Sequence, residues 1–147
     1  MAKTKITDLG SSVCVDDQNE KFVPALGDGT FGLPGNLCYI VAANGRIAGA
    51  DVGTAEFFVG ILMESKITGS ETVIVQDVPC KLVVPKSGHN YRIRCDDLGA
   101  TVIVGNAMTF STTVYKGEKA ATILTGFLGR LALEGLTGDT VCEVTWK

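Results

Sequence analysis

The residue type best suited to general base catalysis occurs once in this chain, as His89. A Ser-His-Asp or Cys-His mechanism needs such a base to take a proton from its nucleophile. His89 lies in the polar, glycine-containing tract 86–90, whose composition indicates a solvated turn. We therefore expect His89 to be a surface residue and the protein not to be an enzyme.

Cysteine is the other residue type here that binds metals or acts as a nucleophile. The chain has five: Cys14, Cys38, Cys80, Cys95 and Cys142. No two of them lie within four residues of each other, which excludes CxxC zinc and redox motifs. Their odd number argues against the disulfide framework of a secreted domain. We expect them to be small buried hydrophobic residues in a reducing compartment.

The carboxylates and glycines form no recognisable cofactor site. The acidic pairs at 16–17 and 96–97 are typical of turns, because an Asp side chain bonds nearby backbone N–H groups. No D-x-D-x-D-G calcium loop occurs, and the glycine-rich tract 27–32 lacks the Gly-Lys-Ser/Thr ending of a phosphate-binding loop. We expect no metal, no cofactor and no small-molecule substrate.

The charge distribution argues against nucleic acid and membrane partners. The 147 residues include 13 Lys and Arg against 16 Asp and Glu, a formal net charge of −3. A mildly acidic chain with scattered basic residues is not attracted to phosphate backbones or anionic lipid. No apolar run approaches the roughly 20 residues that cross a bilayer. Residues 1–8 lack the apolar region of a signal peptide, so we expect synthesis in the cytoplasm.

The elements that position these residues are predicted to be short strands. The chain has 18 glycines and 4 prolines, a balance typical of strands joined by tight turns. Apolar, β-rich segments at 37–43 and 56–63 predict buried strands. Gly60, within the second of them, predicts a bulge or a close backbone approach. The sequence therefore predicts an all-β fold.

Three further segments are assigned with the help of their prolines, charges and glycines. Segment 78–85 predicts a strand that its prolines either place at a sheet edge or limit in length, because proline cannot donate to a ladder. Segment 91–95 alternates cleanly and places its two arginines on the solvent face. Segment 126–133 has loosely helical spacing, but its glycines would each cost about 1 kcal/mol in a helix. We predict a strand there, and a short turn of helix at 118–123 stays open.

Pairs of short segments recur in the same order along the chain, at an offset of 70 residues in the first block and 69 in the second. The pairs are 35–40 with 105–110, 58–62 with 127–131, and 67–73 with 136–141. The first pair opens on Gly-Asn in both copies and continues into an apolar strand. We infer an internal duplication in which residues 33–76 and 103–146 form two similar β units, with 77–102 between them.

Residues 1–32 differ from this repeated part. They mix polar, acidic and glycine-rich stretches with few large apolar side chains. Such a segment indicates an extended N-terminal arm, which can grip a neighbouring molecule, or a loosely tethered first strand. We therefore divide the chain into an arm, 1–32, and a β domain, 33–147.

The first unit carries three short motifs: Ala-Gly-Ala-Asp at 48–51, Phe-Val-Gly-Ile-Leu-Met-Glu at 58–64, and Ile-Thr-Gly-Ser-Glu-Thr-Val-Ile-Val at 67–75. Together they resemble the small capsid cement and head decoration proteins of tailed phages. The second unit is a weaker copy, in which Arg130 stands where an apolar residue is expected.

The resemblance implies a compact β-barrel or β-tulip, often a homotrimer, that decorates the exterior of the virion capsid. Its partners would be the major capsid protein and further copies of itself, and it would be made in the host cytoplasm. A cement protein needs no catalytic group. It needs stiff sheets, together with apolar patches or strand edges that become covered on assembly.

Two other functions stay open. Another virion β protein, such as a tail tube, tail terminator or adaptor subunit, would have a similar composition. A small ligand-binding barrel or enzyme would instead require a concave pocket with converging polar groups. For the decoration protein, we predict five contact residues from the arm, its junction with the β domain and the C-terminus: Phe22, Phe31, Leu33, Pro34 and Trp146.

Overall fold

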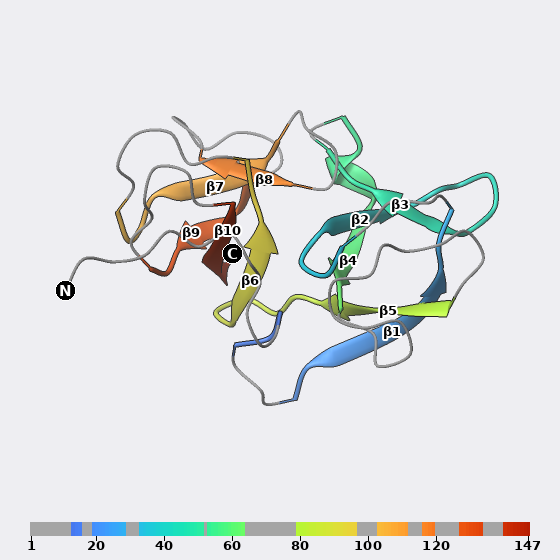
Figure 1. The fold of residues 1–147 in the computed structure, drawn as a ribbon, viewed down its shortest axis with the longest axis horizontal. Coiled ribbons are helices and arrows are strands. Elements are labelled where there is room, and N and C mark those ends of the chain that lie inside the picture. The colour runs from blue at the N-terminus through green and yellow to red at the C-terminus, as the bar shows by residue number, and fades with distance from the viewer. Residues whose placement is uncertain are drawn as a thin grey trace.

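The computed structural model describes residues 13–15, 19–28, 33–51, 53–63, 79–96, 103–111, 116–119, 127–133 and 140–147. Two five-stranded antiparallel sheets lie side by side in this part of the chain (Figure 1). The protein is therefore all-β, as predicted from composition and strand patterning. A single turn of 3₁₀ helix, η1 (Ala55–Phe57), is the one helical element among the described residues.

The first sheet has the strand order β1-β5-β4-β2-β3. Its strands are β1 (Lys21–Leu26), β2 (Leu37–Ile40), β3 (Ile47–Gly49), β4 (Phe58–Leu62) and β5 (Pro79–Val84). The second sheet has the order β6-β10-β9-β7-β8. Its strands are β6 (Asn90–Arg94), β7 (Ala107–Phe110), β8 (Gly117–Lys119), β9 (Phe127–Leu131) and β10 (Val141–Trp146). Replacing each strand of the first order by the strand five places later gives the second, so the two sheets share one topology.

The correspondence extends to an irregularity in the ladder. The pairing of β2 with β4 slips between Cys38 and Tyr39, and the pairing of β7 with β9 slips between Met108 and Thr109. The residues opposite these slips are Gly60 and Gly129. A β-bulge at the same place in both sheets confirms that the fold is built from two related β units, and it confirms the bulge predicted at Gly60.

The Gly-Asn pair at the start of each repeat forms the last two positions of a β-turn. Asn36 N donates to Leu33 O at 3.0 Å, and Asn106 N donates to Ile103 O at 3.2 Å. The intervening Gly35 and Gly105 have φ of 90° and 94°, the conformation that position i+2 of a type II turn requires. In both turns the Asn side-chain oxygen also accepts the first residue's N–H. The repeated dipeptide is thus explained by turn chemistry.

Neither sheet closes into a complete barrel. Among the described residues, the edge strands of each sheet meet at one isolated parallel bridge, Gly27 with Ile47 in the first and Cys95 with Gly117 in the second. Each unit is therefore a strongly curved sheet whose two edges touch at one end.

The described part of the N-terminal region supplies a first strand and not an extended arm, the two alternatives predicted for residues 1–32. Residues 21–26 form β1, which pairs with β5 over its whole length. Upstream of it, Val13 is fully buried and Cys14 bridges Tyr91 of β6. Alternating partly buried Val23 and Ala25 explain the difference, because they supply the inward face of a strand.

The prolines of segment 78–85 limit the length of β5 and do not place it at a sheet edge. The strand lies between β1 and β4 and ends at Val84, directly before Pro85. Pro79 is tolerated because it is the first residue of the strand and is exposed. Together with β6, this strand shows that the segment 77–102 supplies one strand to each unit, so the strands of the units run from Lys21 to Val84 and from Asn90 to Trp146.

Other strand predictions are confirmed where they can be compared. β9 occupies most of 126–133, and residues 117–119 form strand β8. The remainder of the possible helical turn at 118–123 lies outside the described residues. In β6, buried residues alternate with half-buried ones, which places Arg92 and Arg94 on the outer face as predicted.

The core has two parts. The larger cluster combines side chains of both units, including Leu37, Ile61 and Val83 of the first with Tyr91 and Val144 of the second. A smaller cluster of Cys38, Ile47, Leu62 and Leu82 fills the inside of the first unit alone. Because the larger cluster is shared, the two units bury apolar surface against each other and form one body.

Candidate interaction surface

Three aromatic rings join the two units. Phe58 of β4 stacks on Trp146 of β10 with ring centroids 5.5 Å apart and an interplanar angle of 25°. Phe58 also meets the edge of Phe110 of β7, with centroids 5.4 Å apart. On its other side, Trp146 contacts Tyr91 edge-on at 6.1 Å. These offset and edge-to-face arrangements stabilise aromatic pairs beyond their apolar burial.

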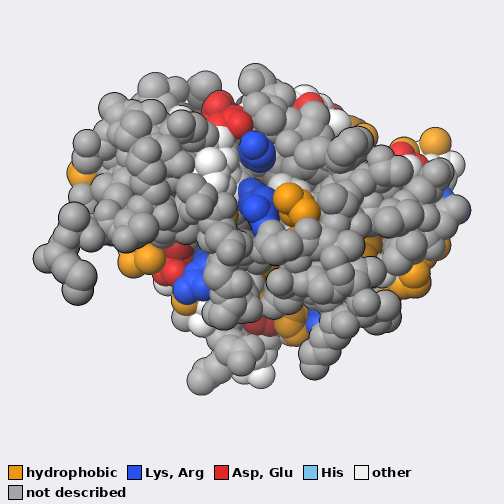
Figure 2. All heavy atoms as spheres, viewed as in Figure 1, with side chains coloured by type: hydrophobic (Ala, Val, Ile, Leu, Met, Phe, Trp, Pro, Cys, Tyr) orange, Lys and Arg blue, Asp and Glu red, His pale blue; other side chains and the backbone are white. Residues whose placement is uncertain are grey.

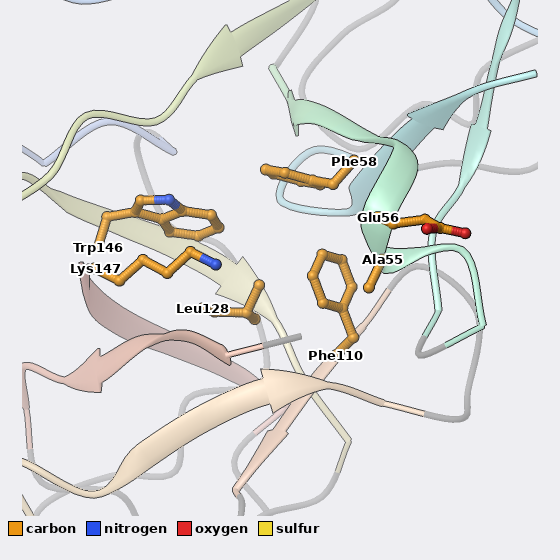
Figure 3. Close-up of a pocket in the computed structure, with 7 residues that line it drawn as sticks. All are labelled: Ala55, Glu56, Phe58, Phe110, Leu128, Trp146 and Lys147. Atoms are coloured by element: carbon orange, nitrogen blue, oxygen red, sulfur yellow. The ribbon is translucent and has the colours of Figure 1, made fainter. Parts of the chain in front are cut away.

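A hollow of about 220 Å³ opens beside these rings (Figure 3). Its lining comes from η1 and β4 of the first unit and from β7, β9 and β10 of the second: Ala55, Glu56, Phe58, Phe110, Leu128, Trp146 and Lys147. The Lys147 ammonium points toward the hollow, whereas the Glu56 carboxylate points away from it. A mostly apolar lining with one charged group lacks the converging polar groups that fix a small ligand.

A second contact between the units is polar. Arg94 of β6 donates its backbone N–H to Gly35 O at 3.0 Å and its Nε to Pro34 O at 2.7 Å. The turn that opens the first unit therefore lies on the outer edge of the second sheet. We call the 33–36 turn with Arg94 the internal joint.

A buried carboxylate connects the start of β1 to β6. The Glu20 side chain is 2% exposed. Its Oε1 lies 2.5 Å from His89 Nδ1, and its Oε2 accepts a hydrogen bond from the Tyr91 hydroxyl at 2.6 Å. The Tyr91 hydroxyl also accepts the N–H of Lys86 at 2.9 Å. Burial raises the pKa of Tyr91, and the hydrogen bond to Glu20 raises it further.

The histidine is therefore more constrained than the solvated loop residue predicted from sequence, although 30% of its side chain is exposed. The Tyr91 phenol is held neutral by burial and by its carboxylate partner, so it is a poor nucleophile. We call the hydrogen-bonded cluster of Glu20, His89 and Tyr91 the polar clasp, because it connects two chain segments that are distant in sequence.

The cysteines behave as small hydrophobic residues in the described structure. None of the five forms a disulfide, and four of them are buried. Burial raises the pKa of the Cys38 thiol, with the neighbouring Cys80 adding to it, and burial also raises the pKa of Cys80. Raised pKa values keep these two thiols protonated and unreactive. No group of three or more His, Cys, Asp or Glu side chains in the described ranges is placed to hold a metal ion.

The predicted contact residues are placed differently from one another. Phe22 lies on β1 with 42% of its surface exposed, and Lys81 Nζ stands 4.6 Å from its ring centroid. Leu33 is half-buried and Pro34 is buried in the internal joint. Trp146 is 8% exposed and belongs to the shared core. Phe31 lies outside the described residues. Of the five, Phe22 is the described residue that is open to a partner.

Other exposed hydrophobic side chains were not singled out in the sequence. They are Leu26, Ile40, Phe57, Ile103, Val104 and Leu133, each at least 40% exposed. Figure 2 shows hydrophobic side chains along the right-hand margin, on the side of the first sheet, and basic side chains near the middle of this face. Strand alternation alone does not identify these residues, because an exposed apolar residue has the same sequence signal as a buried one.

Glu20 was also missed. It is 69 residues from His89 in sequence, and no local pattern connects them. In the described part of the chain, no helix has the length and apolar character to cross a membrane. No protein-family model matches the sequence, and no curated protein matches it either.

Proposed function

We propose that this protein is a capsid decoration (cement) protein, which binds the outer surface of a major capsid protein lattice and stabilises it through protein–protein contacts. The observation that carries the proposal is an apolar stripe on an edge strand of a stiff two-unit β body. Phe22, Pro24 and Leu26 share the outer face of β1, and all three are exposed. Exposed apolar groups in contiguous array mark interaction sites.

The two-unit body that carries this stripe is suited to stabilising a lattice, because its contact surface is held rigidly. The two units share one core, and aromatic stacking between Phe58 and Trp146 holds them together. A contact surface anchored on such a core loses little conformational freedom when it binds. Repetition over many lattice positions would then make a modest contact effective.

The test is co-sedimentation of the purified protein with expanded shells of the coat protein encoded in the same genome. We expect saturable binding and a higher temperature of shell disruption. Phe22→Asp should weaken binding at least about tenfold, because it places a charge where apolar surface is to be covered.

The matched control is Lys21→Asp, since Lys21 is exposed on the opposite face of the same strand. The proposal fails if the wild-type protein does not sediment with shells. It also fails if Lys21→Asp and Phe22→Asp weaken binding equally, because the loss would then follow charge and not the stripe.

A further inference from the structure

The internal joint connects surfaces that are not equivalent in the two units. It places the 33–36 turn of the first unit on Arg94 of the second. By strand correspondence, the turn's copy is 103–106 and the copy of Arg94 is Leu26, because the bridges Gly27–Ile47 and Cys95–Gly117 align β1 with β6. A joint with two-fold symmetry would place the 103–106 turn on Leu26 of the same chain.

The exposures exclude that arrangement. Ile103 and Val104 are each 60% exposed, and Leu26 is 40% exposed. The contact between Phe110 and Phe58 is likewise made by only one of the two units. Phe110 is 4% exposed beneath Phe58, whereas its copy in the first unit, Ile40, is 43% exposed. The chain thus uses one surface of each unit internally and leaves the other copy of each surface open.

The two open surfaces match each other in chemistry. In the internal joint the strand side is Arg94, which binds backbone carbonyls. In the open copies, an apolar turn, Ile103–Val104, would face an apolar strand residue, Leu26, with Ile40 beside it by analogy with Phe110. Covering these side chains against each other removes apolar surface from water on both sides.

The edge of strand β1 that faces away from β5 can accept a contact from a turn, but it cannot pair fully with an added strand. On β6, Arg92 N donates to Val13 O at 2.8 Å, and Cys14 forms an isolated antiparallel bridge with Tyr91. The β1 residue that corresponds to Arg92 is Pro24, which has no N–H to donate. The position corresponding to the Arg94 contact, Leu26, retains its N–H, which by this register is directed away from β5.

We propose that copies of this chain associate head to tail, with the 103–106 turn of one copy on Leu26 and Ile40 of the next, repeating the internal joint between molecules. Such a heterologous contact produces a ring when its rotation closes and a filament when it does not. The inference goes beyond the proposed function, because association needs no coat lattice. Phe22 lies four residues from Leu26, roughly 13 Å along β1, which leaves that end of the stripe for the coat.

The test uses sedimentation velocity of the full chain and two variants that each damage one side of the contact. The wild type should form an oligomer, and Val104→Asp and Leu26→Asp should each weaken association at least about tenfold. Phe22→Asp is the matched control, since Phe22 is 42% exposed on β1 but lies roughly 13 Å from Leu26, and it should associate as the wild type does. Circular dichroism shows whether each variant is folded.

Mixing the two damaged variants distinguishes a head-to-tail contact from a symmetric one. Each variant keeps the surface that the other lacks, so the mixture should form dimers and nothing larger. A monomeric wild type, variants that assemble normally, or a mixture without dimers would each overturn the inference. None of these outcomes depends on shell binding, so the proposed function stands or falls separately.

Discussion

The two β units share one topology but fill their interiors in opposite ways. In the first unit, Ile47 of β3 is buried with the small Ala25 of β1 packed against its cluster. In the second, the corresponding residues are Gly117 and Ile93. A Cβ on Gly117 would come within 3.0 Å of Ile93 Cδ1. The large and small residues have exchanged strands, which shows that interior volume is conserved more closely than residue identity.

The outer faces differ for another reason. Leu37, Ile61 and Val83 on the outer face of the first sheet are fully buried, because the second unit covers them. Their counterparts in the second sheet include Arg130, which is exposed and donates to Gly105 O at 3.0 Å. Arg130 therefore departs from the apolar pattern because its sheet face is not covered within the chain. The outer face of the first sheet is therefore part of the core, whereas Arg130 on the outer face of the second sheet lies at the surface.

The largest expected effect comes from removing the junction's central ring. Trp146→Ala should lower the free energy of unfolding by about 3–5 kcal/mol, because it leaves a cavity in the shared core. Its counterpart in the first unit, Val84, is half-buried, and Val84→Ala should cost about 1 kcal/mol. Urea denaturation measures both. Equal losses of unfolding free energy at the two positions would show that the aromatic junction does not stabilise the fold more than an ordinary strand residue does.

The shared bulge predicts the next largest effect. A Cβ on Gly129 would lie 2.1 Å from Thr145 O, and one on Gly60 would lie 2.7 Å from Val83 O. Gly129→Ala should cost about 3 kcal/mol or more and Gly60→Ala about 1–3 kcal/mol, since backbone must move in both. Gly45→Ala, where no atom lies within 4 Å, is the control and should cost about 1 kcal/mol for its positive φ. Thermal unfolding would contradict this reasoning if all three variants lost the same stability.

The exchange of a large and a small residue between the two interiors can be tested by placing the residue pair of the first unit at the corresponding positions of the second. Gly117→Ile should destabilise by about 1–3 kcal/mol through overpacking. Adding Ile93→Ala recreates the Ala-Ile pair of the first unit and should recover part of that loss. A double-mutant cycle measures the coupling. Strict additivity of the two substitutions would refute compensation between these positions.

The smallest effect concerns the polar clasp, which has no counterpart in the described part of the first unit. Because the pKa of Tyr91 is raised, the folded state keeps the phenol neutral while the unfolded chain ionises near its ordinary value of 10.0. The stabilisation is complete below that pH and is lost as the pH rises above it. Tyr91→Phe should flatten this alkaline loss in denaturant titrations. A slope that survives in Tyr91→Phe would assign the loss to other groups.

Local sequence signals were sufficient where a residue's role depends on its near neighbours. The bulge glycine and the alternation of β6 follow from backbone freedom and side-chain period, and the structure confirms them. The all-β class and the two related units follow from the same signals. Their physical basis is short-range, so no knowledge of the partner strand was needed.

The tertiary structure decided which of the predicted strands and apolar residues ended up inside. β5 lies within its sheet because β1 pairs beside it, and Trp146 is core because Phe58 packs against it from another unit. The same holds for Glu20, whose partners are distant in sequence. By itself the sequence determined strands, turns and duplication, because these depend on neighbouring residues. Burial of an apolar or charged side chain depends on what the rest of the chain places against it, and only the folded molecule supplies that.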